Sequence, residues 1–126
     1  MVNLQKKSLY FKWMRTSLRP DIKSVFAGQR FRNAERTGDE KAAEGSSWKE
    51  YWQIFTLRDI PNICPFCGEP LAAEEAEGCH VNVAGMFNGK WSVKKYIIPG
   101  HHRCNMLQGE EFVAKIAVKA VEAIEK

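Results

Sequence analysis

Four residues with metal-ligating side chains occur as two pairs in this chain. The first pair, Cys64 and Cys67, has the pattern C-x-x-C, and the second, His101 and Cys104, has the pattern H-x-x-C. This spacing lets one tight turn direct both side chains at the same ion, and two such pairs supply the four ligands of tetrahedral zinc. We therefore predict a closed, structural Zn²⁺ site, because no coordination position remains for water or substrate.

Two other interpretations of these residues are weaker. A lone C-x-x-C also occurs as a redox pair, but the matching H-x-x-C favours zinc. His102 is another potential ligand, but a single residue separates it from Cys104. That spacing is tighter than zinc sites normally use, so His101 is the favoured ligand.

His80 lies between the two pairs, in the sequence Gly78-Cys79-His80-Val81. Hydrolysis of a phosphodiester requires a base with a pKa near neutrality and a cation that neutralises the phosphate. A histidine is suited to the role of that base. The alternative is a histidine hydrogen-bonded within the zinc unit, and the residues leave both roles open.

The segments around these residues carry turn and strand signals. Gly68 permits the positive φ that a tight metal-binding turn often needs. Residues 80–83 alternate as a strand does, and turn residues at 85–89 precede a returning strand over 91–98 that Pro99-Gly100 ends. Residues 101–107 are predicted to form a helical turn that presents Cys104.

Helices are predicted on both sides of this unit. A short one over 8–19 ends before Pro20, and Ser47 begins a clearer one with a capping box to Glu50. An aromatic stripe at helical spacing follows, which favours a core-facing helix: Trp48, Tyr51, Trp52 and Phe55. Apolar residues at three- and four-residue steps predict a C-terminal amphipathic helix: Val113, Ile116, Ala117, Ala120, Val121 and Ile124.

These elements define an α+β protein with a small zinc-stapled ββα core. We expect residues 1–62 to form a basic, mainly helical region that packs on the core. Residues 63–126 should form the zinc-binding ββα domain and the C-terminal helix. A chain of 126 residues, 44% of them hydrophobic, is ordinary for a soluble protein with one core.

Charge is distributed unevenly along the chain. Residues 1–36 contain nine Lys/Arg and two Asp/Glu, a net charge of +7, whereas residues 37–78 carry −6 and residues 79–126 carry +3. A basic arm of this kind is typical of nucleic-acid binding, although a solvated basic face without a partner is the alternative. No apolar run resembles a membrane span or signal peptide, so we expect a cytoplasmic protein with reduced cysteines.

The order of the motifs over residues 63–110 resembles the HNH (ββα-metal) nuclease family, in its zinc-containing, treble-clef-like members. The resemblance rests on the C-x-x-C pair, His80-Val81, Ile97-Ile98-Pro99 and Cys104-Asn105. It implies that His80 is the general base that activates water. It also implies that Asn105 helps to bind a catalytic divalent cation.

Two family positions carry other residues here. Cys79 stands where the family usually has an aspartate ligand, and Tyr96 stands where it has the asparagine that orients the base. Mg²⁺ prefers oxygen ligands, so a cation beside Cys79 would be a softer ion such as Mn²⁺ or Ni²⁺.

The sequence therefore supports two expectations. One is an HNH-like protein with a structural Zn²⁺ that binds nucleic acid, DNA rather than RNA, and hydrolyses it with Mg²⁺, Mn²⁺ or Ni²⁺. The other is a non-catalytic, zinc-stapled module. Such a module would bind nucleic acid through its basic arm, or a protein partner through the aromatic stripe.

Overall fold

The computed structural model describes residues 4–126, so the first three residues of the basic arm lie outside the described part of the chain. The helices are α1 (Leu4–Arg15), α2 (Trp48–Thr56), the one-turn 3₁₀ helix η1 (Ala73–Glu75) and α3 (His102–Asn105). The strands are β1 (Ile22–Val25), β2 (Arg30–Asn33), β3 (Ala76–Val83), β4 (Tyr96–His101), β5 (Glu111–Val113) and β6 (Val118–Glu122). The protein is therefore mixed α+β, as predicted.

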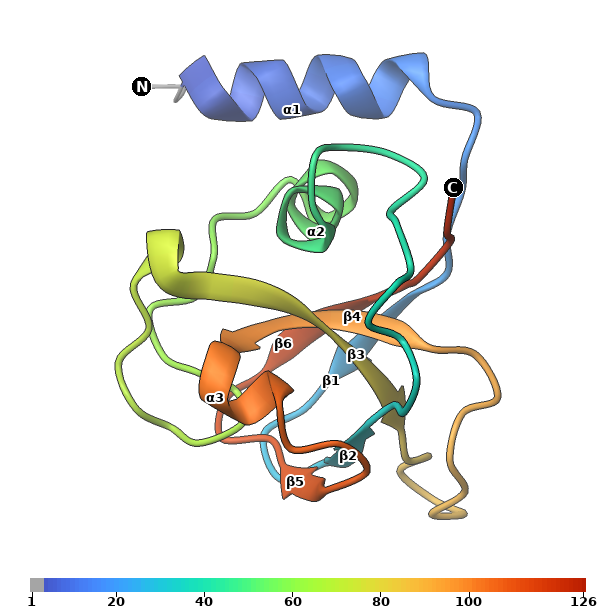
Figure 1. Ribbon diagram of the computed structural model, residues 1–126, viewed down its shortest axis with the longest axis vertical. Helices are drawn as coiled ribbons and strands as arrows, with labels where there is room; N and C mark the ends of the chain where they lie inside the picture. Colours follow the sequence, from blue (N-terminus) through green and yellow to red (C-terminus); the bar gives the residue numbers. More distant parts are fainter. Residues whose placement is uncertain (1–3) are drawn as a thin grey trace.

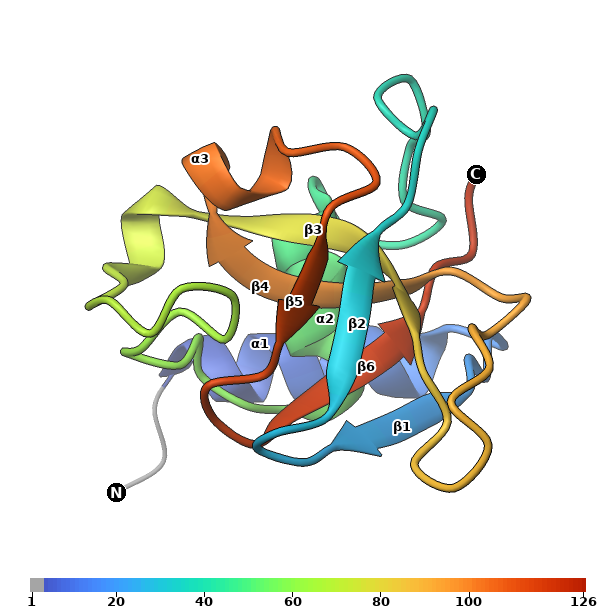
Figure 2. The same ribbon diagram turned by 90° about the horizontal axis from the view of Figure 1, so that it is seen from below.

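The six strands form one antiparallel sheet in the order β1-β6-β4-β3-β2-β5. The sheet curls strongly, so β1 and β2 run in different directions although a short turn joins them (Figure 2). The amide of Gly28 in that turn donates to the carbonyl of Ala114, 2.8 Å away, and ties it to the β5–β6 connection. Strands from both predicted regions, 1–62 and 63–126, thus share one sheet.

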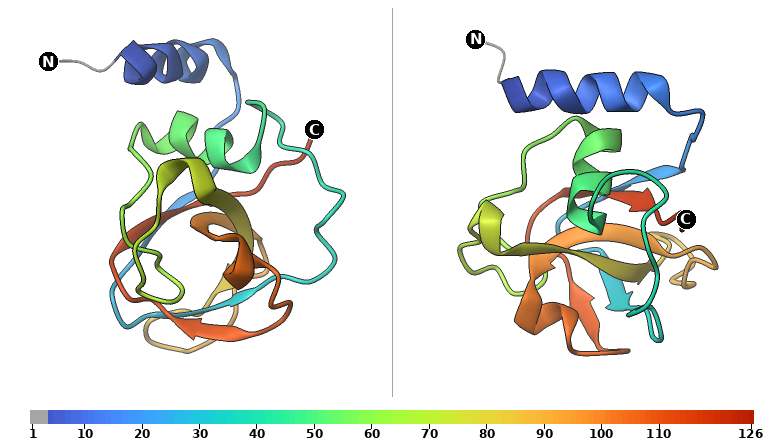
Figure 3. Two further views of the ribbon diagram at one scale, coloured as in Figure 1. Left: turned by 60° about the vertical axis from the view of Figure 1, so that its left-hand side comes forward. Right: turned by 45° about the horizontal axis from the view of Figure 1, so that its top comes forward.

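The molecule has three layers, with α1 above α2 and α2 above the sheet (Figures 1 and 3). The predicted N-cap of α2 is present, because the Ser47 side chain accepts a hydrogen bond from the amide of Glu50. The second half of the capping box differs. The Glu50 carboxylate accepts from Lys12 of α1, 2.6 Å away, and from Ser46, and so ties the two helices together.

The aromatic stripe of α2 faces the sheet, as predicted. Tyr51, Trp52 and Phe55 are at most 5% exposed, and Trp48 is half-buried. Two of these side chains also donate to carbonyls of β6: Tyr51 Oη to Glu122 at 2.5 Å and Trp52 Nε1 to Lys119 at 2.8 Å. The helix is therefore held on the sheet by hydrogen bonds as well as by apolar contact.

One glycine sets the distance between α2 and β3. A Cβ atom at Gly78 would lie 2.5 Å from the backbone carbon of Trp48 and 2.7 Å from the amide nitrogen of Lys49. Only a residue without a Cβ allows the start of α2 to approach the strand this closely.

The prediction of a C-terminal amphipathic helix is wrong. Residues 111–113 and 118–122 form β5 and β6, and Val121 of β6 pairs with both Ile22 of β1 and Ile97 of β4. Because β6 has a neighbour on each side, its backbone groups are satisfied by the sheet. The periodicity fitted a helix, but long-range pairing overrides local helix propensity.

The returning strand and the first helix also differ from prediction. β4 starts at Tyr96 and continues to His101, so Pro99 lies inside it, paired with Gly78 of β3. Proline is tolerated because β6 pairs only with Tyr96 and Ile97, which leaves β4 without a second neighbour at that point. α1 spans Leu4–Arg15, earlier than the predicted 8–19.

The expected ββα core is not confirmed. β3, β4 and α3 follow one another in the predicted order, but α3 has four residues and the two strands belong to the larger sheet. Among the described helices, none combines the length and the apolar character that crossing a membrane requires.

Candidate metal centre

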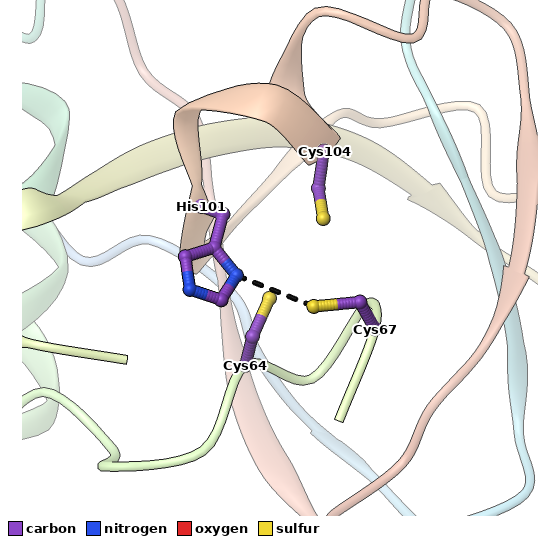
Figure 4. Close-up of side chains that lie close together, drawn as sticks. All are labelled: Cys64, Cys67, His101 and Cys104. Carbon is purple, nitrogen blue, oxygen red and sulfur yellow. Dashed lines mark hydrogen bonds between the residues drawn. The ribbon is translucent and has the colours of Figure 1, made fainter. Parts of the chain in front are cut away.

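The two predicted ligand pairs converge in the structure. Sγ of Cys64, Cys67 and Cys104 and a ring nitrogen of His101 lie within 4.8 Å of one another. Figure 4 shows the three sulfur atoms and the imidazole directed at a common centre. Within residues 4–126 this is the single group of three or more Cys, His, Asp or Glu residues that could hold a metal ion.

The first pair lies in a tight turn, here called the knuckle (residues 63–70). The amide of Gly68 donates to the carbonyl of Cys64 at 2.9 Å, and Gly68 has φ +79°, as its sequence position predicted. Phe66 projects from the knuckle into the core and packs edge-on against Phe31 of β2 and Phe112 of β5, with centroid distances of 4.8 and 5.0 Å. The core therefore helps to fix the position of the knuckle.

The second pair lies where β4 passes into α3. His101 is the last residue of β4 and Cys104 lies within α3. The carbonyl of Cys104 accepts a hydrogen bond from Nδ2 of Asn33, 2.7 Å away, and this bond anchors the short helix to β2. Both halves of the cluster are thus attached to the same sheet.

The hydrogen bonding of His101 selects the nitrogen that faces the cluster. Nε2 lies 2.9 Å from the carbonyl oxygen of Pro70 and must carry a proton to donate to it. In the tautomer with the proton on Nε2, Nδ1 offers its lone pair, and it lies 3.3 Å from Sγ of Cys67. A ligating histidine normally makes this kind of second hydrogen bond, which fixes its tautomer and orientation.

His102 does not take part in the cluster. Its side chain is exposed, and Nδ1 lies 2.5 Å from a carboxylate oxygen of Glu77. The preference for His101 over His102, based on spacing alone, is confirmed.

The thiols of the cluster influence one another's charge. Burial and then the neighbouring Cys64 raise the pKa of Cys104 to about 12. Burial also acts to raise the pKa of Cys67, but hydrogen bonds from the Glu69 amide and from Arg103 outweigh it and lower the pKa to about 6. Arg103 Nη2 lies 3.5 Å from Cys67 Sγ, so one cation is already placed beside the sulfur atoms. Three sulfur donors and one imidazole are a donor set that suits a structural metal ion.

His80 and Asn105, the predicted catalytic residues, line one pocket of about 430 Å³ beside this cluster, together with Glu40, Trp48 and Glu77. Asn105 Nδ2 donates to a carboxylate oxygen of Glu77 at 2.9 Å. The structure thus brings His80 and Asn105 to the same pocket, but it also adds two carboxylates that the sequence did not single out.

His80 is buried between the ring of Trp48 and the carboxylate of Glu40. Its ring packs edge-on against Trp48 at a centroid distance of 4.6 Å, and 6% of the residue is exposed. Nε2 lies 3.1 Å from Glu40 Oε2 but is not aligned for a hydrogen bond, and it has no other partner within the described chain. Burial lowers the pKa of His80 to about 4, and the charge of Glu40 offsets this only in part. The imidazole is therefore neutral at pH 7.

Cys79 and Tyr96 point away from this pocket. Cys79 is fully buried, with Sγ 3.6 Å from the carbonyl of Glu77, and it does not line the pocket. The hydroxyl of Tyr96 donates to Asp21 at 2.6 Å. Neither residue therefore takes the role that the HNH resemblance assigns to its position.

Glu40 and Glu77 were missed because their positions carry no spacing signal. Glu40 lies in a polar loop, 40 residues from His80 in the chain. Glu77 is three residues before His80, and in the fold it lines the pocket beside Asn105 of α3, to which it is hydrogen-bonded.

No family model matches this chain, and no curated protein or solved structure shows significant similarity to it.

Proposed function

We propose that the Cys₃His cluster binds one structural zinc ion, and that this chain is a zinc-stabilised nucleic-acid-binding protein. Zinc with Zn–S bonds of about 2.3 Å separates its tetrahedral ligands by about 3.8 Å. The ligand atoms here lie within 4.8 Å of one another, so a small contraction is enough to complete the site. Zinc in such a closed site stabilises the fold and does no chemistry on a substrate.

Nucleic-acid binding rests on one observation, the excess of unpaired cations in the basic arm. Six basic side chains of this segment make no ion pair within the described residues: Lys7, Arg15, Arg19, Lys23, Arg32 and Arg36. Most of them are exposed. Unpaired surface cations bind phosphates by releasing the counterions that surround a nucleic acid.

The test is the salt dependence of binding. Affinity for a labelled DNA duplex should fall steeply with salt, with a slope of about −0.9 for each phosphate contacted. The combined variant Arg15→Gln, Lys23→Gln, Arg32→Gln should flatten that slope. The combined variant Arg58→Gln, Lys115→Gln, Lys126→Gln removes the same charge outside the arm and should bind with nearly the wild-type slope.

The result that overturns this proposal is equally clear. If the wild-type protein, loaded with one zinc ion, binds neither DNA nor RNA at low salt, the arm is a solvated surface. Equal slopes for the two combined variants would show that the net positive charge of the whole protein, rather than the arm, causes binding.

Hydrolysis of the bound nucleic acid is a second candidate function, favoured by the pocket that His80 and Asn105 share. Glu77 places a carboxylate there, an oxygen ligand that Cys79 does not provide. A cation held by Glu77 and Asn105 would lie in the same pocket as the imidazole of His80. The HNH resemblance implies these roles for Asn105 and His80, and Glu77 is added by the geometry of the pocket.

Plasmid nicking with Mg²⁺, Mn²⁺ and Ni²⁺ in turn tests this second candidate. Loss of a general base costs about 10²–10⁴ in rate, so His80→Ala should reduce nicking by that factor while zinc content stays unchanged. Absence of cleavage with all three ions, or equal cleavage by the variant, would leave His80 with a packing role against Trp48.

A further inference from the structure

A tryptophan on the outer face of the sheet lies beside two arginines. Cζ of Arg32 is 4.5 Å and Cζ of Arg30 is 5.2 Å from the ring centroid of Trp91. Trp91 is half-buried and belongs to the loop between β3 and β4. Two guanidinium groups on one indole form a positively charged aromatic surface.

The register of the sheet places a polar residue next to this group. Arg32 of β2 pairs with Asn82 of β3, so their side chains stand on the same face of the sheet. Residue Phe31, between the two arginines, points to the opposite face and is fully buried. We use the name Trp91 surface for Arg30, Arg32, Asn82, Phe87 and Trp91.

The loop that carries Trp91 is held in place by hydrogen bonds. The amide of Gly85 donates to the carbonyl of Lys90 at 2.8 Å, and Ser92 is bonded to Val83 through both its amide and its hydroxyl. Asn82 Nδ2 donates to the carbonyl of Ser92 at 3.1 Å. An ordered loop presents its aromatic side chains at a low cost in conformational entropy.

The tip of this loop exposes an aromatic side chain that the fold does not use. Phe87 is 104% exposed, so it contributes nothing to the core. Lys90 lies between Phe87 and Trp91 in the sequence and is exposed as well. A fully exposed phenylalanine on an ordered basic loop is suited to contact a partner that has both flat apolar faces and negative charge.

A polar hollow of about 210 Å³ adjoins Arg32. It is lined by Arg32, Asn33, Glu35, Asn82 and Gly109. Asn33 donates through Nδ2 to two carbonyls, whereas its buried Oδ1 accepts no hydrogen bond within the described chain. The hollow thus combines the guanidinium donors of Arg32 with the carboxylate acceptor of Glu35, and donors and acceptors are the groups that recognise the edge of a nucleobase.

We propose that the Trp91 surface binds single-stranded nucleic acid, with bases stacked on Trp91 and Phe87 and phosphates paired with Arg30 and Arg32. This inference rests on the proposed function and specifies its substrate. Base faces are available for stacking in a single strand but are covered by neighbouring bases in a duplex. Arg30 is partly engaged by Glu111 at 2.9 Å, so Arg32 is the main phosphate contact of the surface.

Fluorescence anisotropy with a labelled 12-nucleotide strand and with its duplex tests this assignment at fixed low salt. The zinc-loaded wild-type protein should bind the single strand at least tenfold more tightly than the duplex. Phe87→Ser and Trp91→Leu should each weaken single-strand binding roughly tenfold, within the range of stacking losses. Arg32→Gln should weaken it similarly and reduce the salt slope by about 0.7.

Two further variants separate stacking from loss of structure. Trp91→Phe keeps an aromatic face and should retain most of the affinity, but it should lose the quenching of tryptophan fluorescence that binding causes in the wild-type protein. Arg58→Gln removes one positive charge directly after α2 and should bind like the wild-type protein. Because Phe87 makes no core contact, Phe87→Ser is decisive even if Trp91→Leu is poorly folded.

Two outcomes distinguish this inference from the proposed function. If the wild-type protein binds no nucleic acid at all, the proposed function itself fails. If it binds single strand and duplex equally, and Phe87→Ser and Trp91→Phe match the wild-type protein in affinity and quenching, the Trp91 surface is not the binding site and nucleic acid binds elsewhere on the arm.

Discussion

Nε2 of His101 donates a hydrogen bond to the carbonyl oxygen of Pro70 across 2.9 Å. Pro70 belongs to the knuckle that holds Cys64 and Cys67, so this hydrogen bond connects the two halves of the metal centre directly. This bond leaves Nδ1 of His101 free to act as the ligand.

The first prediction concerns the metal. Purified without chelator, the protein should contain one zinc ion per chain, and Cys67→Ser should reduce this below half an equivalent. The contribution of structural zinc is about 10 kcal/mol or more in small domains, comparable with a domain's whole stability, so the variant should unfold cooperatively at much lower denaturant concentration. Metal analysis and urea titration measure the two effects.

Cys79→Ala is the matched control for that experiment. Cys79 is buried in the core and lies outside the cluster, so the variant should keep its zinc and lose only modest stability. Loss of zinc from Cys79→Ala to the same extent as from Cys67→Ser would contradict the assignment of the four ligands.

The second prediction concerns the contact between α2 and β3. Gly78→Ala places a Cβ atom 2.5 Å from the Trp48 backbone, so the helix must shift, at a cost of about 1–3 kcal/mol or more. Gly38→Ala is the control, because nothing lies within 4 Å of a Cβ atom there. Urea denaturation should separate the two variants, and equal midpoints would mean that α2 does not approach the strand this closely.

The third prediction concerns acid. The pKa of His80 is lowered from 6.5 to about 4 in the folded protein, so the unfolded state takes up a proton first as the pH falls. Stability contributed by the neutral imidazole is present above pH 6.5 and is lost between pH 6.5 and about 4, by up to about 3 kcal/mol.

Replacement of His80 by phenylalanine tests this pH dependence. The variant keeps a ring against Trp48 but cannot be protonated, so it should lose less stability than the wild-type protein between pH 7 and pH 5. Parallel curves for wild type and His80→Phe would show that the charge of Glu40 offsets the lowering of the pKa by burial and by Lys95, the other charged group facing the ring.

The fourth prediction concerns the start of α2. Ser47→Ala removes the side-chain oxygen that accepts from the Glu50 amide at 3.1 Å and should cost about 1 kcal/mol. Ser46→Ala removes a longer, exposed hydrogen bond to the Glu50 carboxylate and should cost less. Thermal unfolding of both variants compares the two serines, and a larger loss for Ser46→Ala would place the cap elsewhere.

The features that the sequence predicted well are those with local causes. The spacing of the ligands identified all four members of the cluster. Each pair is brought together by a turn that involves only the two residues between its members. The stripe of α2 was predictable for the same reason, since a helix of nine residues carries its own periodicity. The N-cap at Ser47 likewise depends on a residue three positions away.

The features that were missed depend on distant parts of the chain. β6 is a strand because β1 and β4 lie on either side of it, and no local pattern reports those neighbours. β2 did carry a signal, since Arg30 and Arg32 alternate with buried Phe31 and Asn33, but the segment is only four residues long. The pocket of His80 could not be predicted from the sequence, because Glu40 comes from a loop that has no recognisable sequence pattern.

The pairing of Ile22 with Val121 also has a consequence for biosynthesis. β1 leaves the ribosome early, but its partner β6 is made nearly one hundred residues later. Synthesis proceeds at about 5–20 residues per second, so the edge of β1 stays unpaired for roughly 5–20 seconds. The unpaired edge of β1 is thus open to premature association until β6 emerges.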